Sequence, residues 1–578
     1  MNPSPFRPTL LPQRLLSWLL VGLATLPGTC AWAEGEKPQE GKPQDLFGEV
    51  IDVRVVNLEV VVEDDAGRVL DLKPSDFVLT VDGERVPVEY FSAVVGNVSQ
   101  APVEQADGTV PALQPGAKVG TSYLIFVDDY FPLKQDRDRV LDGFIEQLPN
   151  LGPEDRMALV AFDGSKLDML STWSRSVPEL TRAFQKAKLR DTRGLQRLAA
   201  NRSFEVGADI DELNLGFDRI ALDNDDTYAM FIAGYQADLT PDEERYARVL
   251  FGQADRAVRA AAATLRSFAD PPGRKVMLIL AGGWPSDPSL WATGDALRAG
   301  RSRGKVRGQG LLSPLIETAN LLSYTLYPVD VPGMSAAVAD AGQITPTLNA
   351  QRFGLALDRE RQEEAALFQL ARETGGKALL NSNRSRAFEA VVADTRTYYW
   401  LGFTPSWKGD DSGHAIRVRL RDGLGKDLKV RTRRSFSDLS RGTEVDMMVE
   451  STLRIGNPPS VAPLHAKIEP GTRAGIGKRK IPVKIAIPLG RLTFLPTAQG
   501  FAAEAELRVA VLDDKGYATE EIPVVPMSLK TPRVPEQDAF KLYETSITLR
   551  NGRHELVLSL YDKPSGKILA TKLEVPAR

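Results

Sequence analysis

The sequence is poor in the residues that most thiol, redox and metal sites require. Among 578 residues it has one cysteine and three histidines. Cys30 lies in an N-terminal segment that we expect to be removed, which excludes disulfides, thiol catalysis and cysteine-ligated zinc from the mature chain. His414, His465 and His554 all fall in segments expected to be β, which favours isolated surface residues over a histidine cluster.

The sequence also lacks the features of membrane-spanning and nucleic-acid-binding proteins. No apolar segment after residue 33 is long enough to cross a bilayer. The formal net charge is −4, and removal of residues 1–33 makes it −6 because two arginines and no acids are lost. A mildly acidic protein offers no electrostatic attraction to phosphate backbones, so we expect no nucleic-acid partner.

Motifs of the common catalytic classes are missing as well. There is no G-x-S-x-G sequence. His554 and Glu555 start like a zinc-protease motif, but no histidine follows at the required position. Residues 471–479 are glycine-rich and contain Lys478, yet Arg479 stands where a phosphate-binding loop needs serine or threonine. We therefore expect that the protein is not an enzyme.

Residues 1–33 have the pattern of a secretory signal peptide. Arg7 and Arg14 precede an apolar core at residues 15–26, and Ala31-Trp32-Ala33 is a small-x-small cleavage site. We expect a mature chain that starts at Glu34 and is extracytoplasmic, either periplasmic or secreted. The alternative is an N-terminal membrane anchor, for which the apolar run is short.

Turn and strand patterns then divide the chain into domains. Residues 34–47 are polar and predict a disordered leader. Residues 48–97 show strand patterns around a turn at residues 64–67 and another at Asp82-Gly83, which predicts a small, Ig-like β domain. Residues 98–120 have no periodicity and are expected to be a linker.

Residues 121–436 alternate strand and helix patterns. The apolar run Ser122-Tyr-Leu-Ile-Phe-Val-Asp-Asp129 indicates a buried parallel strand that ends at two carboxylates. The alternation predicts an α/β domain with a doubly wound, mostly parallel sheet, interrupted by insertions near residues 190–240 and 332–360. Only four residues separate the strands expected at 157–162 and 167–170, which requires an antiparallel pair at one edge.

The remaining elements are expected as follows. Further strands of this domain are predicted at 276–280, 324–329, 378–380 and 398–403, and helices at 134–148, 177–187, 243–268, 312–322, 363–373 and 386–392. Residues 437–463 predict a helical linker with a helix at 441–450. Residues 464–578 predict a second all-β domain, a β-sandwich.

Several stretches in this order resemble a family, the bacterial exported proteins with a von Willebrand factor A (VWA)-related domain. They are residues 60–77, Phe126-Val-Asp-Asp129, Gly273-Arg-Lys-Val-Met-Leu-Ile-Leu280, Leu370-Ala-Arg-Glu-Thr-Gly-Gly376, Tyr398-Tyr-Trp-Leu-Gly-Phe-Thr-Pro405 and Val430-Arg-Thr-Arg-Arg-Ser-Phe436. The resemblance covers roughly residues 48–440. It implies a VWA-like fold whose ligands bind at the carboxyl edge of the sheet.

The resemblance also implies where a divalent cation such as Mg²⁺ would bind. VWA domains often use a D-x-S-x-S loop, a threonine and a third-loop aspartate, since Mg²⁺ prefers hard oxygen ligands. In this sequence Asp128 or Asp129 matches the leading aspartate, Thr192 the threonine, and Asp287 is the nearest carboxylate to the third position.

The metal pattern is incomplete in this chain. The serine positions are occupied by Tyr130 and Pro132, or by Phe131 and Leu133, and Ala281-Gly-Gly-Trp284 replaces the third acid. The structural alternative is that Asp128 and Asp129 cap the helix that follows them. We therefore expect a degenerate metal site and no bound cofactor.

The leading functional hypothesis is an exported binding or scaffold protein that recognises an extracytoplasmic protein partner. The expected contact residues lie at the carboxyl edge of the sheet: Asp128, Asp129, Tyr130, Thr192, Trp284 and Asp287. One alternative is a cation-dependent adhesion protein that uses Asp128 and Asp129. Another is an accessory subunit of an extracytoplasmic hydrolase.

Overall fold

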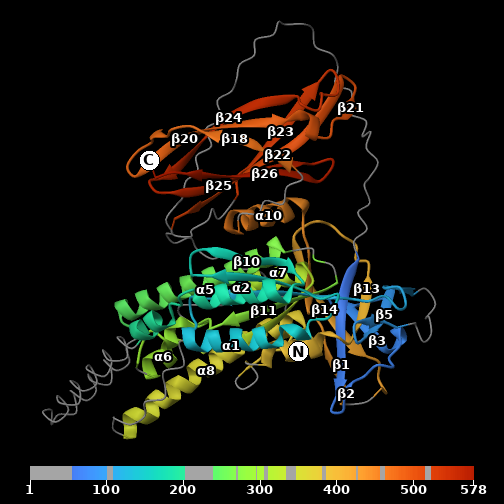
Figure 1. Cartoon of the computed structure of the whole chain (residues 1–578), viewed down its shortest axis with the longest axis vertical. Helices are drawn as coiled ribbons and strands as arrows, with labels where there is room; N and C mark the ends of the chain where they lie inside the picture. Colours follow the sequence, from blue (N-terminus) through green and yellow to red (C-terminus); the bar gives the residue numbers. More distant parts are fainter. Residues whose placement is uncertain are drawn as a thin grey trace, which may run out of the picture. The chain divides into compact units, whose positions relative to one another are not determined.

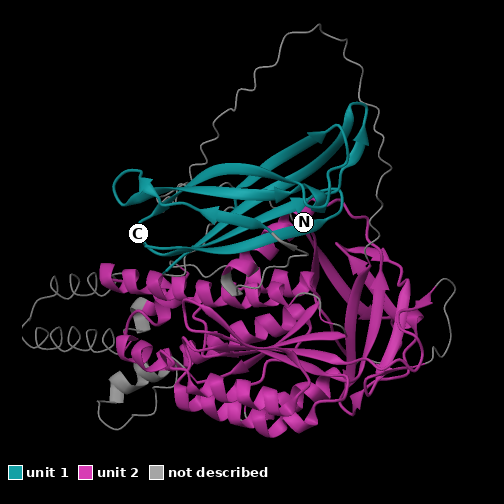
Figure 2. Cartoon of the chain, turned by 45° about the horizontal axis from the view of Figure 1, so that its top comes forward, with its two compact units in different colours: residues 1–46, 456–578 teal, residues 47–455 magenta. Residues whose placement is uncertain are grey.

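The structure is a computed structural model of the chain (Figure 1). It describes residues 55–100, 109–201, 239–268, 271, 273–294, 296–304, 310–332, 346–380, 384, 386–424, 427–455, 462–514 and 522–577. The signal peptide and leader expected at residues 1–47 lie outside these residues, as do residues 202–238 and 333–345 of the expected insertions. The described residues fall into two compact units, one within residues 47–455 and one within 456–578 (Figure 2).

The centre of the first unit is a five-stranded sheet in the order β10-β9-β8-β11-β12. Its strands are β8 (Thr121–Asp128), β9 (Arg156–Phe162), β10 (Leu167–Ser174), β11 (Arg274–Ala281) and β12 (Tyr324–Asp330). Neighbouring strands are parallel except β10, which pairs antiparallel with β9 at the edge. The antiparallel edge pair expected from the short connection is therefore confirmed.

Strand β8 is buried over its whole length, as its apolar sequence predicts. Its side chains alternate between two hydrophobic clusters: Tyr123, Ile125 and Val127 belong to one, and Leu124 and Phe126 to the other. The sheet therefore has an apolar layer on each face.

Helices cover both of these layers. The Tyr123 side packs against α1 (Lys134–Gln147), α2 (Val177–Leu189) and α9 (Ala387–Thr395). The Leu124 side packs against α5 (Pro241–Ser267), α7 (Ser313–Leu321) and α8 (Pro346–Thr374). The start of α5 is fixed by a capping box between Thr240 and Glu243, with Pro241 at the first helical position. This part of the chain is an α/β domain.

Two of the expected elements differ in the structure. Helix α8 begins at Pro346, so the last part of the insertion expected near residues 332–360 is helical. The strand expected at 378–380 is reduced to a single bridge, in which Leu379 pairs with Val329 of β12.

The β domain of the first unit is built from two distant segments. Its sheets have the orders β15-β1-β13-β5-β6 and β16-β14-β3-β4. The strands are β1 (Val56–Asp64), β2 (Gly67–Arg68), β3 (Phe77–Val81), β4 (Glu84–Val86), β5 (Tyr90–Val95), β6 (Val98–Ser99), β7 (Val110–Pro111), β13 (Tyr398–Phe403), β14 (Ser412–Leu420), β15 (Lys429–Arg431) and β16 (Ser435–Asp438). Residues before and after the α/β segment therefore share one core.

This arrangement corrects two expectations. Strand β13 does not join the parallel sheet; it pairs antiparallel with β1 and β5, because its aromatic face packs with Phe77 and Phe91. The α/β domain expected to reach residue 436 therefore gives way to the β domain at about residue 398. Parts of the expected linker, β6 and β7, also pair with β5.

Helix α10 (Arg441–Ile455) closes the first unit and contains the helix expected at 441–450. Arg266 of α5 forms an ion pair with Glu450 of α10. The second unit is all β around one apolar core. Its strands are β17 (Ala462–Pro463), β18 (His465–Ile468), β19 (Thr472–Arg473), β20 (Lys478–Pro488), β21 (Leu495–Thr497), β22 (Gly500–Asp513), β23 (Val524–Thr531), β24 (Phe540–Arg550), β25 (His554–Asp562) and β26 (Lys567–Val575).

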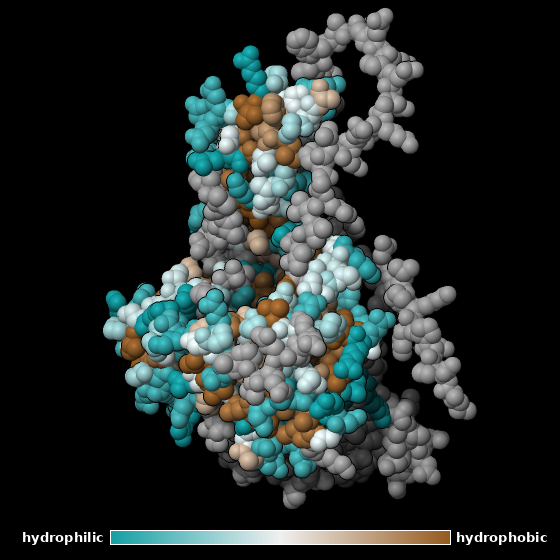
Figure 3. All heavy atoms as spheres, turned by 90° about the vertical axis from the view of Figure 1, so that its right-hand side faces the viewer, coloured by the Kyte–Doolittle hydropathy of each residue, from teal (hydrophilic) through white to brown (hydrophobic). Residues whose placement is uncertain are grey.

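None of the helices in the described part of the chain is both long and apolar enough to cross a membrane. Figure 3 shows hydrophilic residues interspersed with hydrophobic ones on one face of the molecule.

Candidate functional site

The candidate site lies where the chain changes direction in the parallel sheet. From β8 the chain moves to β9 and β10 on one side, then returns as β11 on the other side of β8. Open α/β sheets bind ligands beyond the carboxyl ends of their strands at such a switch point. Here the loops that follow Asp128 of β8 and Ala281 of β11 meet.

Asp128 ends β8 and is completely buried. Its two carboxylate oxygens accept hydrogen bonds from the Tyr130 backbone N–H (2.8 Å) and from the Trp284 indole N–H (2.9 Å). Burial raises the pKa of Asp128 to about 8, although the Trp284 donor opposes this shift. At neutral pH this carboxyl group is therefore largely protonated.

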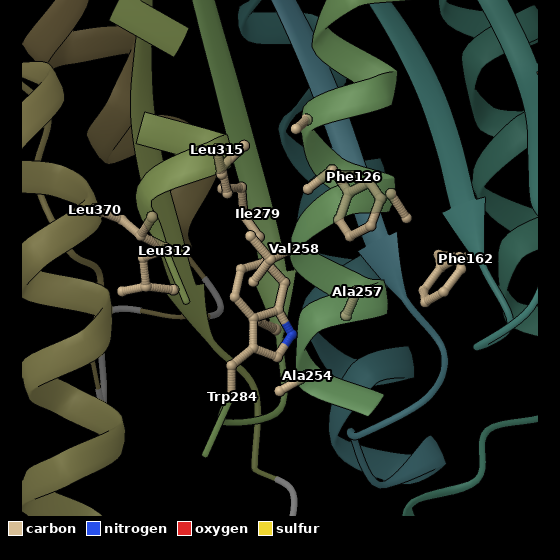
Figure 4. Packing of buried hydrophobic residues seen from close by; sticks show 14 of the residues in the cluster. Phe126, Phe162, Ala254, Ala257, Val258, Ile279, Trp284, Leu312, Leu315 and Leu370 are labelled. Atoms are coloured by element: carbon tan, nitrogen blue, oxygen red, sulfur yellow. The ribbon is translucent and has the colours of Figure 1, made fainter. Parts of the chain in front are cut away.

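Trp284 joins the two loops and closes the space between them. Its indole is buried and lies close to Ala254 and Val258 of α5 (Figure 4). A side chain at Gly282 would come within 2.4 Å of the Pro132 nitrogen, so only glycine allows the loops to approach this closely. The switch point is therefore filled by protein side chains.

Asp129 is also buried, but its partners are cations. Arg137 of α1 donates to one of its oxygens and Arg190, just after α2, donates to the other, each at 2.5 Å. Burial raises the pKa of Asp129, and both guanidinium groups act in the opposite direction. Each carboxylate oxygen therefore has a positively charged donor.

Arg137 connects this cluster to the end of α2. It is completely buried and donates to the backbone carbonyl oxygens of Lys188 and Arg190 as well as to Asp138. Arg190 also forms an ion pair with Asp168 of β10. The two arginines thus fix the segment after α2 against the end of β8.

Tyr130 packs inside the same cluster. The guanidinium of Arg197 lies over its ring, 4.1 Å from the ring centre, and also hydrogen-bonds its hydroxyl group. A side chain at Gly164 would overlap the Tyr130 ring, with a closest distance of 2.1 Å. Burial lowers the pKa of Arg197 to about 10, so it remains charged at neutral pH.

The structure places Thr192 near Asp129 and Asp287 in the loop after β11. The backbone N–H of Arg193 donates to the Asp129 carbonyl oxygen at 3.0 Å, which brings the half-buried Thr192 alongside the end of β8. Asp287 caps the short 3₁₀ helix Pro288–Leu290 through the Ser289 N–H (3.3 Å) and also accepts from the Gly304 N–H.

These contacts do not fit a divalent cation. All four carboxylate oxygens of Asp128 and Asp129 accept hydrogen bonds from N–H groups. Within the described residues, no group of three or more His, Cys, Asp and Glu side chains is arranged to hold a metal ion. A cation at Asp129 would have to displace an arginine.

Two expectations about these residues are corrected. Asp128, Asp129, Tyr130 and Trp284 are buried, so they form a closed cluster in place of the exposed contact face that we expected. Neither carboxylate caps α1, whose N-cap is Leu133. The hypothesis that this edge of the sheet contacts a protein partner now applies only to the segments around the half-buried Thr192 and Asp287.

The sequence hypothesis missed the three arginines that complete the cluster, Arg137, Arg190 and Arg197. For Arg137 a signal was present. It lies three, four and seven residues before Val140, Leu141 and Phe144, on the buried face of α1. A cation on an apolar face indicates a buried acidic partner.

Comparisons with known proteins identify no family for this chain. No family model matches it, and no curated protein matches it. Solved structures that match include an aerotolerance-related membrane protein of Bacteroides fragilis, with 9% identity, a TM-score of 0.20, and 48% of this chain and 100% of that chain covered. Another is the pilus adhesin SpaC of Lactobacillus rhamnosus GG, with 7% identity, a TM-score of 0.17, and 86% and 57% covered. TM-scores this low support no conclusion about this chain.

Proposed function

We propose that this chain is an exported, non-enzymatic binding or scaffold protein. Its α/β domain would be a doubly wound, VWA-like domain that recognises an extracytoplasmic protein at the carboxyl edge of its sheet. The sheet order supports this proposal, because the switch point is where such sheets bind ligands. Many functions share one fold, so the proposal depends on the side chains at this edge.

The observation that carries the proposal is the pairing of Asp129 with Arg137 and Arg190. In the VWA pattern a cation bound near this position attracts an acidic ligand. Here two guanidinium groups pair with the carboxylate, and their ion pairs hold the neighbouring loop in place. Recognition in this proposal is therefore independent of metal.

The contact surface that we propose is the segment 189–195, beside the closed cluster. Leu189 is 84% exposed and Leu195 is 68% exposed, and both flank the arginine-rich turn that packs on Asp129. Exposed leucines that are held by a rigid buried network favour a protein partner, because the rigid network lowers the entropy cost of binding.

Site-specific photocrosslinking in the producing cell tests this surface. A photoreactive amino acid at Leu195 is expected to give a crosslinked partner that mass spectrometry identifies. Val177, 37% exposed at the other end of α2, is the matched control. The same products from both positions, or none from Leu195, would argue against the proposed surface.

The export part of the proposal has its own test. Fractionation of the producing cell, followed by N-terminal analysis of the purified chain, should give a protein outside the cytoplasm that starts at Glu34. A cytoplasmic chain that retains Met1 would contradict export while leaving the binding surface to be judged by the crosslinking result.

A further inference from the structure

We propose that the β19–β20 hairpin of the second unit docks the protein on an anionic lipid surface. The inference concerns a different unit from the proposed protein-binding surface and does not depend on it. Residues 471–479, glycine-rich in the sequence, form the tip of this hairpin and not a phosphate-binding loop before a helix.

The tip presents one apolar side chain to solvent. Ile476 is 94% exposed, the largest exposure among the large hydrophobic residues of the described chain. It lies between Gly475 and Gly477, which both have positive φ angles (116° and 67°). The Ala474 N–H donates to the Lys478 carbonyl oxygen at 3.0 Å, which closes the turn and directs residue 476 outward.

The tip is also fixed to the neighbouring hairpin. The Asn551 N–H donates to the Gly477 carbonyl oxygen at 2.8 Å, and the Arg479 guanidinium donates to the carbonyl oxygens of Gly552 and Pro576. A tip held in this way would lose little conformational entropy on contact with a surface.

Four cations without acidic partners lie on the strands next to the tip. They are Arg473, Lys478, Lys480 and Arg550, of which all but the half-buried Lys478 are exposed. Among the described residues, no aspartate or glutamate forms an ion pair with any of them, whereas Lys484 farther along β20 is paired with Glu469 and Glu544. The positive charge at the tip is therefore available to an external anion.

The register places like charges directly opposite one another. Arg473 faces Arg479, and Lys478 faces Arg550. Such cross-strand pairs destabilise a sheet, and an anionic partner would remove the repulsion. Residues 464–578 carry 18 Lys and Arg against 13 Asp and Glu, although the whole chain has a net charge of −4.

An exposed apolar tip next to several unpaired cations matches the chemistry of an anionic bilayer surface. The apolar side chain enters the boundary between headgroups and acyl chains, while lysine and arginine contact the lipid phosphates. A soluble polyanion would use the cations but leave Ile476 exposed to water. The apolar tip therefore favours the lipid surface over a soluble polyanion.

Vesicle co-sedimentation of the full chain tests the proposal. We expect stronger binding to vesicles of phosphatidylcholine with 30% phosphatidylglycerol than to vesicles of phosphatidylcholine alone. Lys478→Gln with Lys480→Gln should weaken binding by roughly 25-fold, about fivefold for each charge removed. Ile476→Ser should weaken it by about tenfold, because a serine gains little from apolar burial.

The matched control alters similar residues at another site of the same unit. Val534 is 60% exposed, and Lys530 and Arg533 are exposed beside it. The triple variant Lys530→Gln, Arg533→Gln, Val534→Ser should bind as the unaltered chain does. Because the apolar residues 15–26 are present in all of these proteins, only differences between variants are informative.

A fluorescence measurement tests whether the tip of the hairpin itself contacts the lipid. In a Cys30→Ser background, Ile476→Cys carrying an environment-sensitive nitrobenzoxadiazole dye should brighten with anionic vesicles, and the same dye at Val534→Cys should not. Equal binding by all variants, or equal dye responses at both positions, would overturn the proposal. Competition by dextran sulfate with no effect of Ile476→Ser would instead indicate a soluble polyanion as ligand.

Discussion

Two buried carboxyl groups of the first unit, Asp128 and Asp394, have pKa values that are shifted in opposite directions. Asp128 accepts only neutral N–H donors, and burial raises its pKa to about 8. Burial would also raise the pKa of Asp394, but Arg431, Lys377 and Arg68 outweigh it and hold that pKa well below its usual range. The cations around Asp394 thus outweigh its burial, whereas Asp128 has no cation among its hydrogen-bond donors.

The difference corresponds to two structural roles. Asp394 lies in α9 and joins segments from both parts of the first unit: Arg68 of β2, Arg431 of β15 and the Tyr327 hydroxyl of β12. Asp128 joins two loops at the switch point through Trp284. We therefore expect charge removal to damage the Asp394 network far more than the Asp128 contact.

The largest effect is expected for Asp394→Asn. The change leaves three cations facing a neutral amide in a partly buried site, which should lower the free energy of unfolding by about 3 kcal/mol. Urea unfolding followed by tryptophan fluorescence measures this loss. Glu389→Gln, on the same helix, removes an ion pair with the exposed Arg386 and should change the unfolding midpoint little. Similar unfolding midpoints for the two variants would show that the charge of Asp394 contributes little to stability.

A smaller loss is expected for Arg137→Met, about 2–3 kcal/mol, because Asp129 keeps Arg190 as a partner. Arg139→Met removes an exposed cation from the same helix and should change stability by less than about 0.5 kcal/mol. The same urea experiment compares them. An Arg137 variant as stable as the Arg139 variant would show that the buried pair contributes little.

The pH dependence of stability should separate the two carboxyl groups. Between pH 3.8 and about 8, folded Asp128 holds a proton that the unfolded chain releases, so this group lowers stability as pH rises, by up to about 1.4 kcal/mol per pH unit. Asp128→Asn should remove this slope, while its lost bond to Trp284 adds only a constant offset. Asp394 acts in the opposite sense, since its stabilisation is lost as pH falls below 3.8. Unfolding midpoints at pH 5, 6, 7 and 8 measure the Asp128 effect, and parallel profiles for the two proteins would contradict it.

The smallest effect is expected from divalent cations. A ligand at a hundredfold excess over Kd raises stability by about 2.7 kcal/mol, but Arg137 and Arg190 already occupy Asp129. Thermal melts with millimolar Mg²⁺, Mn²⁺ or Ca²⁺ should therefore match an EDTA control. A dose-dependent rise in Tm that Asp129→Ala abolishes would support the cation-dependent alternative.

Sequence patterns predicted the helices and strands around the site because residues that are close in the sequence determine those elements. Strand β8, helix α1 and the antiparallel β9–β10 pair follow from an apolar run, a helical period and a four-residue connection. The partners of the side chains could not be predicted in the same way. Trp284 is buried by α5 and Asp129 is paired by an arginine 61 residues away, and neither contact leaves a local signal.

Strand β13 shows the same limit at the level of the fold. Its composition predicted a strand at 398–403, and a strand is present. Its partners are β1 and β5, because Tyr399 packs against Phe77 and Phe91 across more than 300 residues of chain. A strand sequence specifies which faces are apolar but not which neighbour covers them.

The β domain of the first unit is built from two distant segments, so it cannot fold until the second segment has been synthesised. The Tyr399 hydroxyl donates to the Val69 carbonyl oxygen, a contact that spans 330 residues. At translation rates of about 5–20 residues per second, β1 would wait roughly 15–70 seconds for its neighbour to be made. During that interval its backbone N–H and C=O groups on that side are open to other chains. A newly made molecule therefore needs protection at its N-terminal strands until residues 398–403 have been synthesised.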